Sequence, residues 1–253
     1  MTINGLAGQG TFAIPGGISF HYVTSDADSG ISSSKVYTHA LDFGSGNVAT
    51  VNGVAFTQVT GSSAANYSNG PGSGHGGGNL GYISSILDTQ GIYNLYRDMC
   101  YNKQDVSPTV FSGLTPGKRY DMRIYIRRWN GDGELNQNRD RPVEFIFDTD
   151  DDPTNDDSVT IGVDRFEPAY LSYRYVALTD HINVTLHSLN TADTFHFYGV
   201  TNEEIDDGTV TVDCAQDCTF SGNLTGCGVW AKAGKGALTI TGVSTANGPV
   251  TVA

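Results

Sequence analysis

The alternation of polar and apolar residues over residues 114–129 is the feature that most constrains how this chain can fold. The stretch opens near Pro116-Gly117, which predicts a turn because proline presets φ and glycine accepts a positive φ. After the turn, every second residue from Tyr120 onward is apolar, and Ile124 and Ile126 belong to this set. A strand sends successive side chains to opposite faces. We therefore expect a long strand whose apolar face lies in a core.

The opposite face of this strand carries arginines and aromatic rings. One interpretation is a solvated surface on which the arginine stems lie over the rings. The other is a glycan platform, on which sugars stack against rings while guanidinium groups donate to hydroxyls, carboxylates or sulfates. Residues of the following loop and of a later strand join this platform if the strands are neighbours. The candidate ligand-binding residues are Arg123, Tyr125, Arg127, Trp129, Arg139 and Tyr173.

The composition of the chain favours short strands over helices. Its 253 residues include 32 glycines, and only 16% are charged. No long stretch has a 3.6-residue apolar period, and the modest helix candidate at 81–101 contains Gly91. We expect an all-β fold, with an antiparallel β-sandwich of the jelly-roll type over residues 1–204. A short β-solenoid-like or β-hairpin appendage is expected over residues 205–253.

The net charge of −13 narrows the classes of partner. It opposes binding to nucleic acid, whose recognition needs a basic surface, and binding to anionic membrane surfaces. No run of about 20 apolar residues predicts a membrane span. The first residues lack the basic and apolar regions of a signal peptide, so we expect any export signal to have been removed. This acidic net charge suits a secreted or cell-surface protein.

The densest group of charges lies at residues 148–157, here called the acidic loop. Clustered carboxylates supply the oxygen ligands that calcium prefers. Pro153 and Val159 stand where an EF-hand loop needs glycine and glutamate, so the loop is not an EF-hand. A solvated acidic hairpin loop also explains the sequence. If a cation is bound, we expect calcium, with ligands drawn from Asp148, Asp150, Asp152 and Asp156.

The four cysteines are unevenly spaced. Cys100 stands alone, whereas Cys214, Cys218 and Cys227 form a cluster. Their spacing matches no familiar zinc pattern, and no histidine lies near them. We expect a local disulfide or buried thiols in preference to a metal site.

Two families resemble parts of the chain. Residues 37–44, 51–56, 113–120, 125–129 and 195–203 carry the first resemblance. Through them, residues 18–204 resemble a galactose-binding-like, carbohydrate-binding-module type of β-sandwich found repeatedly in large secreted proteins of environmental bacteria. This resemblance implies a jelly-roll fold and often glycan binding, although such sandwiches also serve as spacers.

The second resemblance rests on Lys232-Ala-Gly-Lys-Gly-Ala-Leu-Thr-Ile-Thr-Gly242. This stretch resembles the core of the autotransporter-associated β-strand repeat, with Ile240 in place of the usual leucine. The clustered cysteines depart from the usual composition of that repeat. The resemblance implies a passenger-type β-helix over residues 208–253 and a native chain that continues beyond Ala253.

Three functions follow from these observations. The first is a non-catalytic carbohydrate-binding module of a larger secreted or cell-surface protein, whose partner is a polysaccharide, neutral or acidic or sulfated. The second is a structural or adhesive domain that precedes a β-helical stalk. The third is a polysaccharide-active enzyme, which ranks last because no motif pairs two carboxylates and no Gly-x-Ser-x-Gly elbow is present.

Overall fold

The computed structural model describes residues 2–4, 11–14, 17–71, 73–75, 86, 88–102, 108–127, 142–162, 168–189, 195–205, 210–226, 230–242, 244–246 and 250–252. The regular secondary structure of these residues is almost entirely β-strand, with one short α-helix and one 3-10 helix among them. None of their helices is long and apolar enough to cross a membrane. The predicted all-β class is confirmed.

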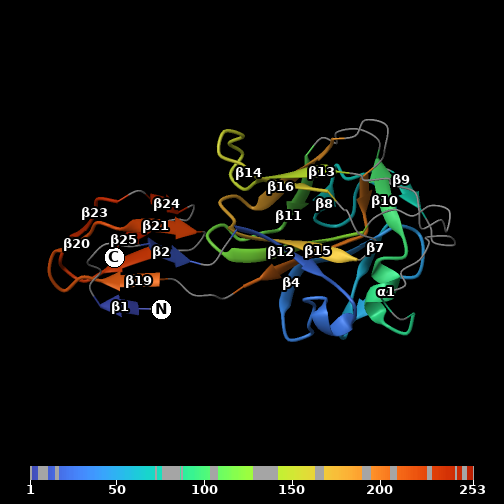
Figure 1. Ribbon diagram of the computed structural model, residues 1–253, viewed down its shortest axis with the longest axis horizontal. Coiled ribbons are helices and arrows are strands. Elements are labelled where there is room, and N and C mark those ends of the chain that lie inside the picture. Colours follow the sequence, from blue (N-terminus) through green and yellow to red (C-terminus); the bar gives the residue numbers. More distant parts are fainter. Residues whose placement is uncertain are drawn as a thin grey trace.

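Two stacked sheets form a β-sandwich (Figure 1). Neighbouring strands are antiparallel except where β7 joins β4. The six-stranded sheet runs β3 (Gly17–Tyr22), β15 (Ala169–Val176), β12 (Arg119–Ile126), β18 (Gly199–Glu204), β4 (Val36–Phe43) and β7 (Thr57–Val59). The five-stranded sheet runs β14 (Asp157–Ile161), β13 (Val143–Asp148), β16 (His181–Ser188), β11 (Thr109–Ser112) and β8 (Tyr67–Ser68). A small sheet of β17 (Phe195–Phe197), β10 (Met99–Asn102) and β9 (Ser73–His75) accompanies them.

The main core lies between the two large sheets. The apolar face of β12 enters it, and Ile124 is fully buried there, as the alternation predicts. Phe145 and Phe147 of β13 and Leu186 of β16 belong to the same cluster from the five-stranded sheet. Burial of such side chains contributes roughly 1.5–3 kcal/mol each.

A third layer covers the outer face of the six-stranded sheet. It contains the 3-10 helix Asp26–Asp28, the hairpin of β5 (Thr50–Val51) and β6 (Val54–Ala55), and the helix α1 (Gly91–Leu95). Side chains of this layer and of the sheet form a second apolar cluster. All eight residues of β12 are therefore buried, whereas an alternating strand alone predicts burial of one face. The cluster includes Ile31, Val51, Ile92, Leu95 and Tyr96 from the layer, Tyr125 and Tyr170 from the sheet, and Tyr198 from the link between β17 and β18.

The short helix α1 is fixed by contacts with distant segments. The carboxylate of Asp26 accepts the backbone N–H groups of Gly91 at 3.0 Å and Ile92 at 2.7 Å. A negative group at this position stabilises a helix start, because the first N–H groups have no partner within the helix. A Cβ atom at Gly91 would overlap the carbonyl of Thr50. The first helical residue must therefore be glycine, because the hairpin leaves no room for a side chain there.

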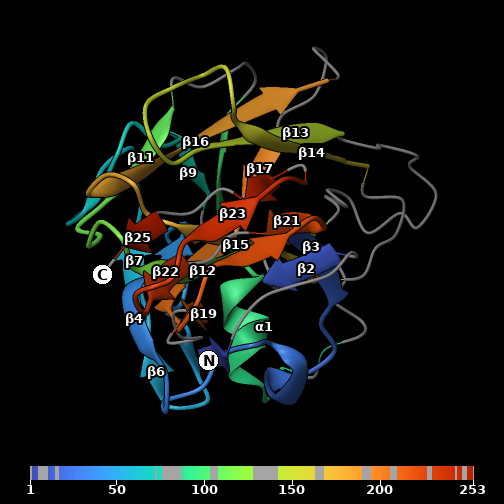
Figure 2. The ribbon, with the colours of Figure 1, turned by 90° about the vertical axis from the view of Figure 1, so that its left-hand side faces the viewer.

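The remaining strands form a set of parallel pairings, here called the parallel stack. One sheet contains β1 (Thr2–Asn4), β19 (Val210–Asp213), β22 (Trp230–Ala233) and β25 (Val250–Val252). A second contains β2 (Thr11–Ile14), β21 (Asn223–Gly226) and β24 (Ser244–Ala246), and a third pairs β20 (Cys218–Phe220) with β23 (Leu238–Ile240). Figure 2 views the molecule from the end that this stack occupies. Successive strands in each sheet come from successive turns of the chain, which is the arrangement of a β-solenoid.

The chain enters the parallel stack twice. Its first strands pair in register with later ones, Thr2 with Thr211 and Thr11 with Asn223. The sequence-based expectation placed residues 1–204 together in the sandwich. The pairings place β1 and β2 in the parallel stack instead, because the C-terminal strands offer them unpaired backbone groups. The division of the chain near residue 204 stays a prediction.

Candidate functional site

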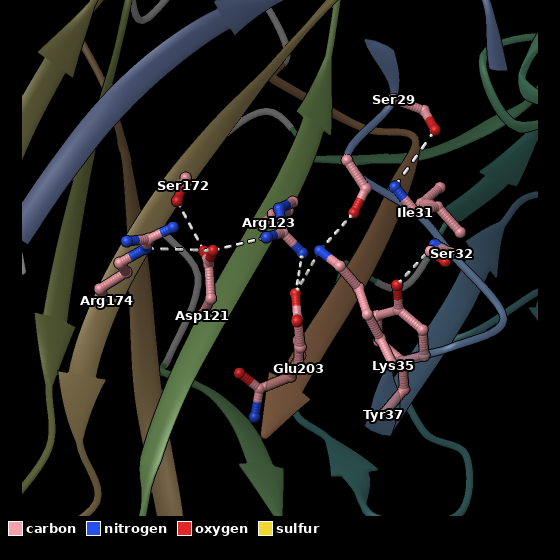
Figure 3. Close-up of polar contacts among 12 residues, drawn as sticks. Ser29, Ile31, Ser32, Lys35, Tyr37, Asp121, Arg123, Ser172, Arg174 and Glu203 are labelled. Carbon is pink, nitrogen blue, oxygen red and sulfur yellow. Dashed lines mark hydrogen bonds and ion pairs between the residues drawn. The ribbon is translucent and has the colours of Figure 1, made fainter. Parts of the chain in front are cut away.

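Charged side chains form a connected group on the outer face of the six-stranded sheet (Figure 3). Asp121 of β12 lies opposite Arg174 of β15 and opposite Glu203 of β18. Residues directly opposite each other in a sheet project from the same face, which brings these three charges together. We call the group the charged row, and it consists of Lys35, Asp121, Arg123, Ser172, Arg174 and Glu203.

Arg123 lies at the centre of the charged row. Its guanidinium donates to Asp121 at 2.5 Å and to Glu203 at 2.7 Å. Lys35 donates to the same Glu203 oxygen at 2.8 Å. Ser172 and Arg174 donate to Asp121 at 2.6 and 3.3 Å, respectively. Burial alone lowers the pKa of Arg123, but the two carboxylates outweigh it and hold the pKa above its usual value.

The segment before β4 covers the centre of the charged row, where Arg123 lies. Lys35 also donates to the carbonyl of Gly30 at 2.9 Å, and Tyr125 donates to the carbonyl of Ser29 at 2.9 Å. A Cβ atom at Gly30 would lie 2.9 Å from Nε of Arg123, so the backbone passes directly over the guanidinium. Arg123 is only 5% exposed. The group is a partnered network, buried at its centre, that attaches this segment to the sheet.

This arrangement differs from the expected glycan platform, whose residues were predicted to lie on an exposed face. Arg123, Tyr125 and Arg127 share one face of the sheet, but all three are buried under the third layer. The guanidinium of Arg127 donates to the carbonyl of Tyr96 at 2.9 Å and lies 5.1 Å from the ring centroid of Tyr198. These contacts leave no open surface on which a sugar ring could stack.

The other three candidates do not join this face. Tyr173 lies opposite Met122 and belongs to the main core, on the other side of the sheet. Its ring stacks on Phe147 with 4.2 Å between centroids, and its hydroxyl donates to Asp157 at 2.7 Å. Trp129 and Arg139 lie outside the described residues.

The acidic loop uses several of its carboxylates to hold its own backbone. Asp148 accepts the N–H of Asp151 at 2.7 Å, and Asp152 accepts the hydroxyl of Thr154 at 2.7 Å. Similar bonds to Asp150 complete the turns. Partial burial, followed by the neighbouring carboxylates, raises the pKa of Asp156. Over the part of the chain that the structure describes, no group of three or more His, Cys, Asp or Glu side chains is arranged to hold a metal ion.

The cysteines follow the predicted local pairing. Cys214 and Cys218 form a disulfide within the parallel stack. Cys100 is a buried free thiol, and burial raises its pKa to about 12. Cys227 lies outside the described residues.

Sequence reasoning missed a pair of buried carboxylates, Asp42 and Asp98, each 1% exposed. Burial, and then the charge of Asp98, raises the pKa of Asp42 to about 8. Burial raises the pKa of Asp98 to about 6. The available signal was an aspartate between Leu41 and Phe43 in a strand that is otherwise buried at this end.

Comparisons with known proteins give partial likenesses. No family model matches the chain, and no curated protein matches it. The solved structures that it resembles in part include a calcium-binding mutant of Bacteroides uniformis beta-glucuronidase 2, with a TM-score of 0.46, 11% identity and 66% of this chain covered. A Bacteroides uniformis beta-glucuronidase gives a TM-score of 0.42, with 12% identity and 60% coverage. The chain spans 18% and 16% of the lengths of these two neighbours.

The charged row predicts that its two arginines, Arg123 and Arg174, contribute very differently to the free energy of unfolding. Arg123→Met removes the central partner of two buried carboxylates, so we expect a loss of about 3–5 kcal/mol in the free energy of unfolding. Arg174→Met changes a side chain that is 42% exposed, and we expect a loss below about 1 kcal/mol. Urea denaturation of both variants measures the difference. Equal losses in the two variants would contradict a network whose buried centre is Arg123.

Proposed function

We propose that this chain is a non-catalytic surface module in which a β-sandwich is displayed from a parallel β-solenoid. The observation that carries the proposal is the register of the parallel stack, in which β1 pairs with β19 and β2 pairs with β21. The chain between them, from β3 to β18, folds as the sandwich. The sandwich is thus an insertion between two turns of a solenoid, and the solenoid serves as its support.

The geometry of the sandwich suits insertion. Gly17, at the start of β3, pairs with Arg174, and Arg174 pairs with Asp121, which in turn pairs with Glu203 near the end of β18. The two ends of the insertion therefore lie at the same end of the sheet, three strand spacings apart, or roughly 14 Å. Closely spaced ends allow one domain to be inserted into another without distorting the host.

The turns of the parallel stack approach one another at the backbone. A Cβ atom at Gly236 would overlap the backbone of Gln216, and one at Gly242 would overlap the carbonyl of Gly222. Glycine is thus required where one turn lies on the next. Turns stacked in this way bury one another's faces, which supports a role as a rigid extension.

The proposed setting is outside the cell, on a larger secreted or cell-surface protein. The Cys214–Cys218 disulfide supports this setting, since disulfides persist in oxidising compartments. The net charge of −13 favours solubility and repels anionic surfaces. The proposal includes no calcium in the acidic loop, because the carboxylates of that loop already accept backbone N–H groups.

A second candidate function, carbohydrate binding by the sandwich, is favoured by an exposed aromatic pair on β3. Phe20 and Tyr22 are 39% and 46% exposed, and their rings meet edge to face with 5.3 Å between centroids. The strand lies at the edge of the six-stranded sheet, where a long polymer has access. Rings of this kind stack on the C–H faces of sugars, with an expected contribution of about 1 kcal/mol each.

The solenoid support predicts two separable unfolding events. Gly236→Val forces a side chain into the backbone of Gln216, so we expect the calorimetric transition of the parallel stack to fall or vanish while that of the sandwich is unchanged. Gly61→Val is the matched control, because no atom lies within 4 Å of a Cβ built there. A single transition that moves as a whole in Gly236→Val would refute the separation of support and module.

The aromatic pair predicts a defined loss of glycan affinity. We expect Tyr22→Ala and Phe20→Ala each to weaken binding of a recognised polysaccharide about 5-fold, the equivalent of about 1 kcal/mol. Leu178→Ala is the control, since Leu178 is also exposed, at 41%, but is not aromatic. Affinity electrophoresis with neutral, carboxylated and sulfated polysaccharides measures the effect. If the three variants bind the polysaccharide as tightly as the wild type does, β3 is excluded as the glycan site.

A further inference from the structure

Two buried carboxylates accept hydrogen bonds from one short loop, residues 44–49. Asp42 is the next-to-last residue of β4, just before this loop, and its Oδ2 accepts the N–H of Ala49 at 2.7 Å. Asp98 comes from the segment between α1 and β10, and its Oδ2 accepts the N–H of Gly46. A Cβ atom at Gly44 would lie 2.6 Å from the Asp98 side chain, and one at Gly46 would lie 2.7 Å from it. The loop backbone therefore rests directly against the Asp98 carboxylate.

Each carboxylate has one oxygen without a protein partner. Oδ1 of Asp42 and Oδ1 of Asp98 are both buried and accept no hydrogen bond. Both residues are 1% exposed, so bulk solvent does not reach these oxygens. A buried carboxylate is strongly unfavourable unless a positive charge or a donor satisfies it. The charge of Arg97 acts on Asp98, but it lowers the pKa by less than burial raises it.

We propose that Asp42 and Asp98 together bind one hard divalent cation beneath the 44–49 loop. Hard cations take oxygen ligands from carboxylates, backbone carbonyls and water, so two carboxylates provide the charge and the loop and water complete the shell. The nearby thiol of Cys100 is not a ligand, because its Sγ donates to the carbonyl of Val59 at 3.4 Å and its pKa is raised to about 12. An all-oxygen site selects calcium or magnesium over zinc.

The cation would join two parts of the chain that are distant in sequence, residues 42–49 and the segment that leads into β10. The outer layer also contacts this region, since Met99 belongs to the second apolar cluster. The role is structural, because it neutralises charges that folding otherwise has to bury.

The test is the cation response of the melting temperature. The full chain is first freed of metal with a chelator. We expect saturating calcium or magnesium then to raise its melting temperature by about 5 °C, because only the folded state brings the two carboxylates together. The two metals are titrated separately to identify which one the site prefers. Asp42→Asn and Asp98→Asn should abolish the response. Asp150→Asn, in the acidic loop, is the matched control and should keep it.

Metal content provides a second measurement that does not require the carboxylate variants to fold. After equilibrium dialysis against calcium or magnesium, the wild-type chain and the double variant Asp150→Asn/Asp152→Asn should each retain one ion per chain. Absence of a retained ion and of a thermal response in the wild type would overturn the proposal. Loss of the ion in the acidic-loop variant would overturn it as well, and would assign the ion to that loop.

Discussion

The parallel pairing of β1 and β2 with strands more than two hundred residues later is the constraint on which the rest of the structure depends. Because β1 and β2 lie in the parallel stack and the chain returns to it at β19, the segment from β3 to β18 must start and finish next to the stack. The antiparallel order β3-β15-β12-β18 satisfies this condition, since it places Gly17 and Glu204 at the same end of the sheet. The sandwich is thus inserted into the stack, with both of its ends next to it.

The charged row lies at that end of the sheet, and this placement gives its burial a physical reason. Asp121, Arg174 and Glu203 occupy the strand register at which the chain passes between the sandwich and the parallel stack. A buried ion pair contributes little net stability compared with well-packed apolar residues, but it strongly penalises any register that separates the charges. The network therefore fixes the alignment of three strands. It also attaches the segment around Gly30 through Lys35.

Local patterns were sufficient for the sandwich strands. The alternation through Ile124 and Ile126 predicted a strand with one face in the main core. Local patterns could not show the third layer, because the burial of Arg123 and Tyr125 depends on segments far away in the sequence. An alternating strand looks the same whether its polar face meets solvent or a charged partner. The expected exposure of Arg123, Tyr125 and Arg127 was wrong for this reason, and the part of the platform at Trp129 and Arg139 stays a prediction.

Pairings between distant strands were equally invisible in the sequence. The short strands β1 and β2 have no feature that assigns them to a parallel stack rather than to a sandwich, because parallel pairing is set by the partner's backbone. Asp42 and Asp98 likewise lie in unrelated segments, and only the fold brings both carboxylates to one loop. The C-terminal glycines were a better guide. The resemblance carried by residues 232–242 implied a β-helix, and the close approach of Gly236 to Gln216 explains why glycine is needed there.

Amide hydrogen exchange tests the insertion of the sandwich into the parallel stack most directly. Exchange is followed at residues 2–4 and 11–14 in the intact chain and in a chain shortened by removal of residues 206–253. The account predicts that these amides are protected in the intact chain and lose protection in the shortened one, whereas residues 119–126 of β12 keep theirs. Equal protection of the N-terminal strands in both chains would contradict it, because their partners would then have to lie within the sandwich.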